Sequence, residues 1–290
     1  MNSVKMNKAI VIRPLHTISE LAKVEALMRA IWGMSDLEIV STHTLHAMVH
    51  SGGQILAAFD GAQMVGFVVS IIGTRSGSQL PAAERLQIYS FIAGVAQAYQ
   101  NQQVGVALKL AQRNFALSLD IPLISWTYDP LESRNAHFNI GKLGAICNQY
   151  HLNFHGEMSG INAGIPTDRF EAQWWVMSDG VAACSRGEKR PLSLMRLREQ
   201  GAVLLNPTNR NEAGLPLPPQ AVMHSDHALL LVEIPAHYQQ IKQQAFPLAQ
   251  QWRQHTQTLF TTYFKKGYTV TDFVTDKSEE ARSSFYVLTK

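Results

Sequence analysis

Apolar residues recur along the first half of the chain at the spacings of helices and strands. In residues 19–31 they come every three or four positions, which predicts a helix with one buried face. Residues 54–59 and 63–72 are apolar runs joined by Asp60-Gly61, which predicts a β-hairpin. The same criteria predict strands at 9–13, 86–95 and 122–127, and helices at 41–50, 104–119 and 134–143.

The pattern weakens between residues 179 and 220. The stretches SRGEKRP and LPLPP flank a short mixed segment there, which we interpret as a connection between two parts. Regular patterns then return and predict a strand at 227–234, a long helix at 238–266 interrupted near Pro247, and paired strands at 268–273 and 284–288. We therefore expect a domain over residues 7–180, a connecting segment over 181–220 and a C-terminal α/β lobe over 221–290.

The amino-acid composition narrows the class of protein and the kinds of partner that we expect. Of the 290 residues, 46% are hydrophobic and 16% are charged, which favours a chain with a sizeable core over a disordered one. The net charge is only +3, whereas a protein that binds nucleic acid is expected to carry a basic stripe or patch. We therefore expect no nucleic-acid partner. Two cysteines cannot form a disulfide framework, and the chain shows neither a signal-peptide core nor a run of about 18 apolar residues. We expect a cytoplasmic protein without a membrane partner, as a monomer or a homodimer.

The stretch GVAQAYQNQQVGVALKLAQRNFAL, residues 94–117, has the clearest chemical meaning. A predicted strand ends there, a loop rich in side-chain amides follows, and a helix starts near Gly105. The start of a helix presents unpaired backbone N–H groups and the positive end of the helix dipole, which suit a pyrophosphate. The spacing alone equally allows a plain strand–loop–helix crossover.

This stretch resembles the acyl-CoA-binding signature of the GNAT superfamily of N-acetyltransferases, V-x-P-x-Y-R/Q-G-x-G-x-G/A. Three positions differ, because Gln97 stands where proline is usual, and Asn101 and Gln103 stand where glycines are usual. A side chain at Gln103 is the larger departure, since it could crowd the pyrophosphate or change the loop. The positions that match are Val95, Tyr99, Gln100, Val104 and Gly105.

A second block, SWTYDPLESRNAHFNIGKLGA at residues 125–145, also resembles this superfamily. With features at 252–260, 265–273 and 285–288, nearly the full chain is similar to a bacterial group of predicted GNAT acyltransferases, some encoded beside N-acylamino-acid racemases. The resemblance implies a mixed α/β (α+β) fold. Its mainly antiparallel, splayed sheet would be flanked by helices, and the C-terminal α/β lobe would resemble a degenerate half of the same fold. The matching residues of this block are Asn135, Ala136, Phe138, Lys142 and Gly144.

The resemblance also implies a reaction. An acceptor amine would attack the thioester of acetyl-CoA or succinyl-CoA directly, and the expected acceptor is a small molecule, with an amino acid as the best candidate. Acyl-CoA would be the co-substrate, and no metal is expected. The alternative is a CoA-binding or regulatory protein that has kept the fold and lost catalysis. The residues implied to contact CoA are Ala93, Gly94, Val95, Gln100, Gln103, Val104, Gly105, Val106, Asn135 and Phe138.

The groups that transfer protons are left open by the resemblance, because Ile140 stands where the family often has a tyrosine. Our candidates are Asp129, which directly follows a predicted strand, together with Tyr89 and Tyr128. Each has a structural alternative: Asp129-Pro130 is typical of a turn, and Tyr89 with Ser90 is typical of strand packing.

Two groups of polar residues allow further interpretations. Three histidines share one predicted helix at spacings that could bind zinc, although a polar helix face is favoured. Four basic residues of the tail could surround an acidic ligand, although a solvated surface is favoured. The histidines are His43, His46 and His50, and the basic residues are Arg253, Lys265, Lys266 and Arg282.

Overall fold

The computed structural model describes residues 10–33, 35–75, 79–156, 164–190, 192–221, 223–277 and 282–290. The chain forms two compact units. The first comprises the chain up to Trp126 together with Trp175–Met177, and the second comprises Thr127–Trp174 and Ser178–Lys290. The two units divide near residue 126. The domain boundaries predicted near residues 180 and 220 stay a prediction.

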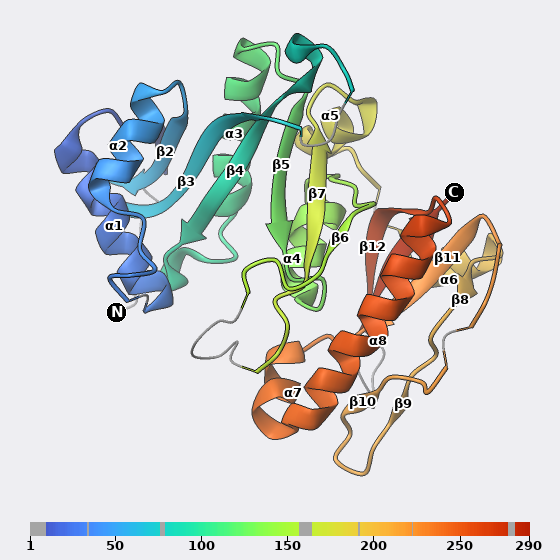
Figure 1. Ribbon diagram of the computed structural model, residues 1–290. Helices are drawn as coiled ribbons and strands as arrows, with labels where there is room; N and C mark the ends of the chain where they lie inside the picture. The colour runs from blue at the N-terminus through green and yellow to red at the C-terminus, as the bar shows by residue number, and fades with distance from the viewer. Residues whose placement is uncertain are drawn as a thin grey trace, which may run out of the picture. The chain divides into compact units, whose positions relative to one another are not determined.

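The first unit is built on a mainly antiparallel sheet with the strand order β1-β2-β3-β4-β5 (Figure 1). The first four strands pair antiparallel, because a hairpin joins β2 to β3 and β3 pairs with β4 across the next connection. The fifth pairs parallel with β4. The strands are β1 (Val11–Pro14), β2 (Gln54–Asp60), β3 (Gln63–Thr74), β4 (Leu86–Val95) and β5 (Leu123–Tyr128).

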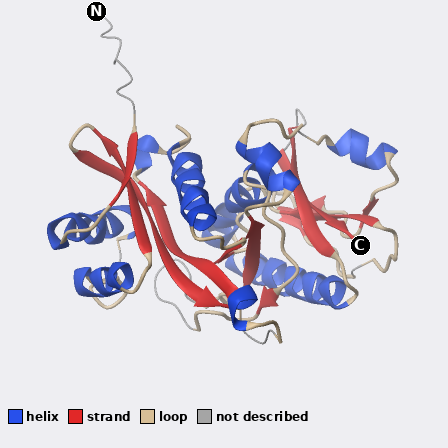
Figure 2. Cartoon of the chain, turned by 90° about the horizontal axis from the view of Figure 1, so that it is seen from above, coloured by secondary structure: helices blue, strands red, loops and turns tan. Residues whose placement is uncertain are grey.

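Helices cover both faces of this sheet (Figure 2). Helices α1 (Ile18–Trp32) and α2 (Thr42–His50) bury Leu21, Val24, Met28 and Leu45 against one face. Helix α3 (Val104–Ser118) buries Val104 and Leu108 against the other. Two short 3₁₀ helices, η1 (Ala82–Arg85) and η2 (Gln97–Tyr99), precede β4 and α3. The predicted class, a mixed α/β fold with a mainly antiparallel sheet flanked by helices, is confirmed.

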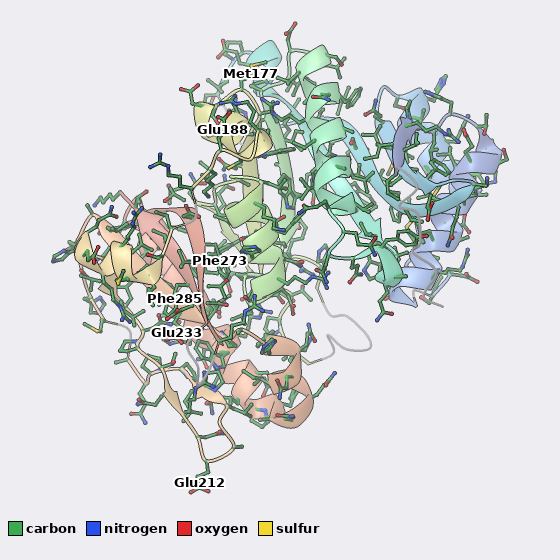
Figure 3. All side chains as sticks on the ribbon, turned by 180° about the vertical axis from the view of Figure 1, so that it is seen from behind. Met177, Glu188, Glu212, Glu233, Phe273 and Phe285 are labelled. Carbon is green, nitrogen blue, oxygen red and sulfur yellow. The ribbon has the colours of Figure 1, made fainter. Side chains whose placement is uncertain are left out.

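The second unit contains another sheet, with the order β12-β13-β11-β8. Its long strands pair antiparallel, so that Glu233 of β11 lies opposite Phe285 of β13, and Figure 3 labels both. The strands of this unit are β6 (Tyr150–His151), β7 (Arg169–Trp175), β8 (Val203–Leu204), β9 (Asn209–Arg210), β10 (Pro216–Leu217), β11 (Leu229–Ile234), β12 (Thr269–Lys277) and β13 (Arg282–Thr289).

In the second unit, an aromatic core joins helix α8 to strands β7 and β13. Phe170 of β7 and Phe260 of α8 meet edge-to-face with ring centroids 4.6 Å apart, and Tyr286 of β13 contacts both rings. Such contacts add to the burial of the rings, so they fix α8 against these strands. The helices are α4 (Ser133–Ala136), the π-helical turn η3 (His137–Lys142), α5 (Asp179–Ser185), α6 (Leu194–Glu199), α7 (Tyr238–Gln244) and α8 (Phe246–Lys265).

Some sequence predictions need correction. The first helix is capped by Thr17 in a capping box with Glu20, so the expectation that it begins at residue 19 is wrong by one residue. By contrast, the predicted interruption of the long tail helix near Pro247 is confirmed: α7 and α8 meet at Ala245, and Pro247 lies in the first turn of α8, where its missing N–H costs nothing. No helix among the described residues is long and apolar enough to cross a membrane.

Candidate functional site

The loop that leads into α3 adopts a backbone conformation that glycine usually provides. Asn101 has φ 63° and Gln103 has φ 64°, both in the left-handed region. Such angles cost a residue with a side chain about 1–2 kcal/mol. Asn101 and Gln103, which stand where the signature that this loop resembles has glycines, therefore keep the glycine-like backbone, and the side chain of Gln103 is exposed.

The first turn of α3 has no side-chain cap. Gln103 is the N-cap residue, yet its side chain accepts no hydrogen bond from the turn, and the first bond of the helix runs from the N–H of Ala107 to the carbonyl of Gln103. Among the described residues, no acceptor is found for the N–H groups of Val104, Gly105 and Val106. A helix of 15 residues thus opens with three free donors and the positive end of its dipole, which is the arrangement that binds phosphate.

The neighbouring glutamines stabilise the loop instead of extending this row of donors. Gln100 Nε2 donates to the carbonyl of Val95 at 3.1 Å, and the backbone N–H of Gln100 donates to Gln97. Gln102 Nε2 donates to Ala98 at 2.7 Å. Each side-chain amide nitrogen carries a second hydrogen that these bonds do not use, so the contact of Gln100 with the pyrophosphate stays a prediction.

A tyrosine fixes the loop to the hairpin. Tyr99 Oη donates to Asp60 Oδ2 at 2.8 Å, and this bond raises the pKa of the Tyr99 hydroxyl. Asp60 ends β2, so the loop is held to a rigid part of the sheet. This contact gives a structural reason for the tyrosine of the signature.

Strand β4 diverges from β5 in its second half. Their parallel pairing ends at Tyr89 opposite Ser125, whereas β4 continues to Val95 along β3. A β-bulge lies at this point: Ser90 pairs with Ser70 and Ile92 pairs with Val69, so Phe91 is the extra residue. The predicted splay of the sheet is confirmed.

The divergence leaves backbone groups of β4 without a strand partner. The bond from the Ala96 N–H to the Val65 carbonyl, at 2.9 Å, sets which residues of β4 bond to β3. Because bonded and non-bonded pairs alternate in an antiparallel ladder, Ala93 and Val95 direct their N–H and C=O groups away from β3. An extended ligand could add to this edge as a strand would.

Gly94 is required by packing. A Cβ atom at this position would come within 2.7 Å of Trp32 and 2.9 Å of Ile31. The end of α1 therefore sits directly on β4, and Gly94 acts through this close approach rather than through a side chain.

A buried polar cluster under β4 was not anticipated from the sequence. Lys109 Nζ of α3 donates to Ser90 Oγ at 2.8 Å and to Gln112 Oε1 at 2.9 Å, and Gln112 Nε2 donates to Ser70 Oγ at 2.7 Å. The ammonium also lies 3.7 Å from the centre of the Trp126 ring. We call Lys109, Gln112, Ser70, Ser90 and Trp126 the Lys109 cluster; the available signal was a pair of polar residues, i and i+3, on the buried side of α3.

The candidate tyrosines differ in environment. Tyr89 of the first unit is half-buried and its ring packs edge-to-face with the exposed Phe91, 6.5 Å between centroids. Tyr128 lies in the second unit, buried, where its hydroxyl accepts a bond from Tyr286. Burial raises the pKa of the Tyr128 hydroxyl well above its ordinary value, so this phenol stays protonated at neutral pH.

Asp129 is engaged in an ion pair. Its Oδ2 accepts from Arg253 Nη2 at 2.5 Å, and its Oδ1 accepts the N–H of Leu131 at 2.9 Å. Both contacts lie within the second unit. Through these contacts Asp129 stabilises the fold of the second unit, and its catalytic role stays a prediction.

The last two residues predicted to contact CoA, Asn135 and Phe138, also belong to the second unit. Asn135 is exposed on α4, and Phe138 is half-buried on η3. The structure therefore brings together the residues predicted from Ala93 to Val106 in the first unit, and it places Tyr128, Asp129, Asn135 and Phe138 in the second. In the described part of the chain, no three His, Cys, Asp or Glu side chains are grouped as a metal site would need.

Comparison with known proteins finds similarity to solved acetyltransferases. No protein-family model matches the chain, and no curated protein matches it. Arabidopsis thaliana NAA60 in complex with acetyl-CoA shares 15% identity over 59% of this chain and 100% of its own, with a TM-score of 0.48. The ribosomal-protein-S18-alanine N-acetyltransferase from Escherichia coli shares 12% identity over 59% and 96%, with a TM-score of 0.46. At such identities and scores, the likeness assigns neither an activity nor a residue role to this chain.

The left-handed conformation of Gln103 leads to a first prediction. Gln103→Gly should preserve or tighten CoA binding, because glycine adopts this φ without strain and removes a side chain from the edge of the free donors. The unfolding free energy of the Gln103→Gly variant should differ from that of the wild type by less than about 1 kcal/mol, since the relief of backbone strain offsets the greater freedom of glycine in the unfolded chain. Calorimetric titration with CoA measures the affinity.

The matched control is Gln103→Val. A β-branched residue tolerates a positive φ poorly, so this variant should weaken CoA binding and lower the stability. A strong loss of affinity in the glycine variant would contradict the assignment of this loop.

Proposed function

We propose that this chain is an acyl-CoA-dependent N-acyltransferase. It transfers an acetyl or succinyl group to a small-molecule amine, with an amino acid as the expected acceptor. The observation that carries the proposal is the uncapped first turn of α3. This turn follows the unpaired edge of β4 after one short loop, residues 96–103. A diphosphate and an amide-containing arm need these two features side by side.

The backbone supplies most of the binding. The N–H groups of Val104, Gly105 and Val106 would hold the pyrophosphate of CoA. Ala93, through its N–H and C=O, and Val95, through its N–H, would pair with the amides of the pantetheine arm, since these groups face away from β3 and the Val95 carbonyl already accepts from Gln100. Because these contacts use main-chain atoms, the departures from the usual signature at Gln97, Asn101 and Gln103 leave them in place.

The reaction then follows from positioning. The acceptor amine attacks the thioester carbonyl, and a backbone N–H of the β4 edge, between the bulge at Phe91 and Val95, stabilises the oxyanion that forms. The attacking amine must lose a proton, for which we propose Tyr89 or Asp129 through water. Asn135 and Phe138 are proposed to contact the pantetheine, and Tyr128 to act as a proton donor.

Two measurements test the proposed function. Calorimetric titration should show binding of CoA and of acetyl-CoA or succinyl-CoA in the micromolar range, roughly 8 kcal/mol. Thiol release from the acyl-CoA should then depend on the amine, across a panel of amino acids and simple amines. Absence of both binding and thiol release would contradict the proposal.

A second function has specific support. The exposed side chain of Gln103 at the helix start, and the buried aliphatic Ile140, favour a CoA-binding or regulatory protein without catalysis. Binding of acyl-CoA without thiol release for any amine would support this alternative.

A further inference from the structure

Lys109 is the most unusual group of the first unit. Its side chain is only 4% exposed, yet it carries an ammonium group. Lysine is almost never buried so completely unless it is paired. The groups that face it are Ser90 of β4, Gln112 of its own helix, Ser70 of β3 next to Gln112, and Trp126 of β5, and none of them carries a formal charge.

The surroundings make this lysine easy to deprotonate. Burial lowers the pKa of Lys109 from 10.5 to about 7, and no charged side chain of the described residues opposes this effect. Hydrogen bonds to Ser90 and Gln112 and the face of the Trp126 ring hold the protonated form. Lys109 can therefore exchange a proton near neutral pH, which an ordinary exposed lysine does not do.

In the proposed binding mode, the Lys109 cluster lies under the part of β4 towards which the pantetheine arm would run. The diphosphate would bind at the start of α3, which follows the C-terminal end of β4, so the pantetheine arm would run back along the strand from Val95 towards the bulge. Val95 and Ser90 are five residues apart, about 17 Å of strand. Ser90 directly precedes the bulge at Phe91, where the pairing with β5 has just ended.

We propose that Lys109 supplies, through the hydroxyl of Ser90, the proton that the departing CoA thiolate takes up. This inference rests on the proposed acyltransferase function and adds a proton donor to it. Ser90 is the group that touches the sulfur, and Lys109 acts through Ser90.

The step balances without a further reactant. The lone pair of the acceptor amine forms the C–N bond, and the C–S bond breaks with its electron pair on sulfur. The Ser90 O–H proton passes to sulfur while the Lys109 ammonium returns a proton to Ser90 Oγ. Lys109 becomes neutral and regains the proton that the acceptor amine releases to water. An ordinary thiol has a pKa of about 8.5, so the transfer from Lys109 runs downhill.

The first test compares Lys109→Met with the wild type, using acetyl-CoA and the best amine of the panel. Loss of the donor should lower kcat by about 100-fold, the low end of what proton transfer contributes, while the affinity for CoA stays within about twofold. The wild-type kcat should fall as the pH rises above about 7, since Lys109 loses its proton there, and the variant should lack this alkaline fall. Lys23→Met, an exposed lysine of α1, is the control and should match the wild type.

The second test uses Ser90 and also covers the case in which Lys109→Met fails to fold. Ser90→Ala should lose activity to the same extent and lack the same alkaline fall, whereas Ser90→Thr, which keeps a hydroxyl, should restore both. A purely structural role for Lys109 would lower stability without changing the shape of the pH profile.

The titration of Lys109 can also be measured without activity. Because its pKa is lower in the folded chain than in the unfolded one, the unfolded chain binds the extra proton between about pH 7 and 10.5. The unfolding free energy of the wild type should therefore rise, relative to Lys109→Met, as the pH increases through this window. A flat difference would overturn the inference.

The two proposals fail in different ways. If the wild type turns over acetyl-CoA and both Lys109→Met and Ser90→Ala keep its kcat and its alkaline fall, the inference is wrong and the acyltransferase function stands. If the wild type releases no thiol with any amine, both are wrong.

Discussion

Gly105→Glu is expected to abolish CoA binding while the protein stays folded. The substitution introduces a carboxylate into the first turn of α3, beside the free N–H groups of Val104 and Val106. A negative charge at this end of a helix stabilises the helix itself. It also repels the pyrophosphate by about 3–4 kcal/mol at contact distance near a protein surface, which corresponds to a loss of more than 100-fold in affinity. Calorimetric titration with CoA, together with thermal unfolding, measures both effects.

The matched control is Gly105→Gln, which adds almost the same bulk without the charge. Its affinity should lie between those of the wild type and the glutamate variant, and raising the salt concentration should bring the two variants closer together. If both variants bind CoA as the wild type does, the start of α3 does not bind the diphosphate.

Asp129→Ala is expected to destabilise the second unit by about 3–5 kcal/mol. The Arg253 side chain is 4% exposed, and Asp129 is its ion-pair partner. Removing the carboxylate leaves a buried guanidinium without compensation, which costs far more than the intact pair contributes. Two further nitrogens of Arg253, Nε and Nη1, have no hydrogen-bond partner among the described residues, and a weaker cation–π contact remains there, with the guanidinium 5.6 Å from the centre of the Tyr238 ring. Unfolding in urea, followed by tryptophan fluorescence, measures the change.

A double variant separates the charge effect from a general loss of packing. Asp129→Ala combined with Arg253→Met has no uncompensated charge and should recover at least half of the lost stability. The same variants test the candidate base, because a purely structural Asp129 would leave kcat unchanged in whatever fraction remains folded. A double variant no more stable than Asp129→Ala would show that the ion pair is not the cause.

Much of the fold could be predicted because the pattern in the first 130 residues is local. The hairpin around Asp60-Gly61 and the alternation of strand, loop and helix from β4 to β5 depend on turn residues and spacing, which a sequence shows directly. Strand β7 was missed, although RFEAQWW alternates buried and half-buried positions, because its partner β6 has only two residues and shows no strand pattern of its own. Long-range pairing of that kind has no local signal.

The candidate site was predictable in its backbone and not in its side chains. The position of the free helix start follows from where the strand ends and the helix begins, and the sequence located both near Val95 and Val104. The sequence does not show the left-handed angles of Asn101 and Gln103, because either residue also fits an ordinary turn.

Distant contacts explain what else was missed. Tyr99 reaches Asp60 across 39 residues, and the buried Lys109 depends on strands on both sides of it. The predicted fold class and splay are confirmed, whereas the roles assigned to Tyr89, Tyr128 and Asp129 stay predictions.

The central claim is that main-chain N–H groups at the start of α3 bind a diphosphate. Amide spectra of protein labelled with ¹⁵N-valine, recorded during titration with CoA, test it most directly, because valines at 104 and 106 report on the first turn. The account predicts that these two resonances shift and saturate together with CoA binding, and that the resonance of Val24, a buried residue of α1 on the other face of the sheet, does not shift. Saturation of CoA binding without a shift at Val104 or Val106 would contradict it.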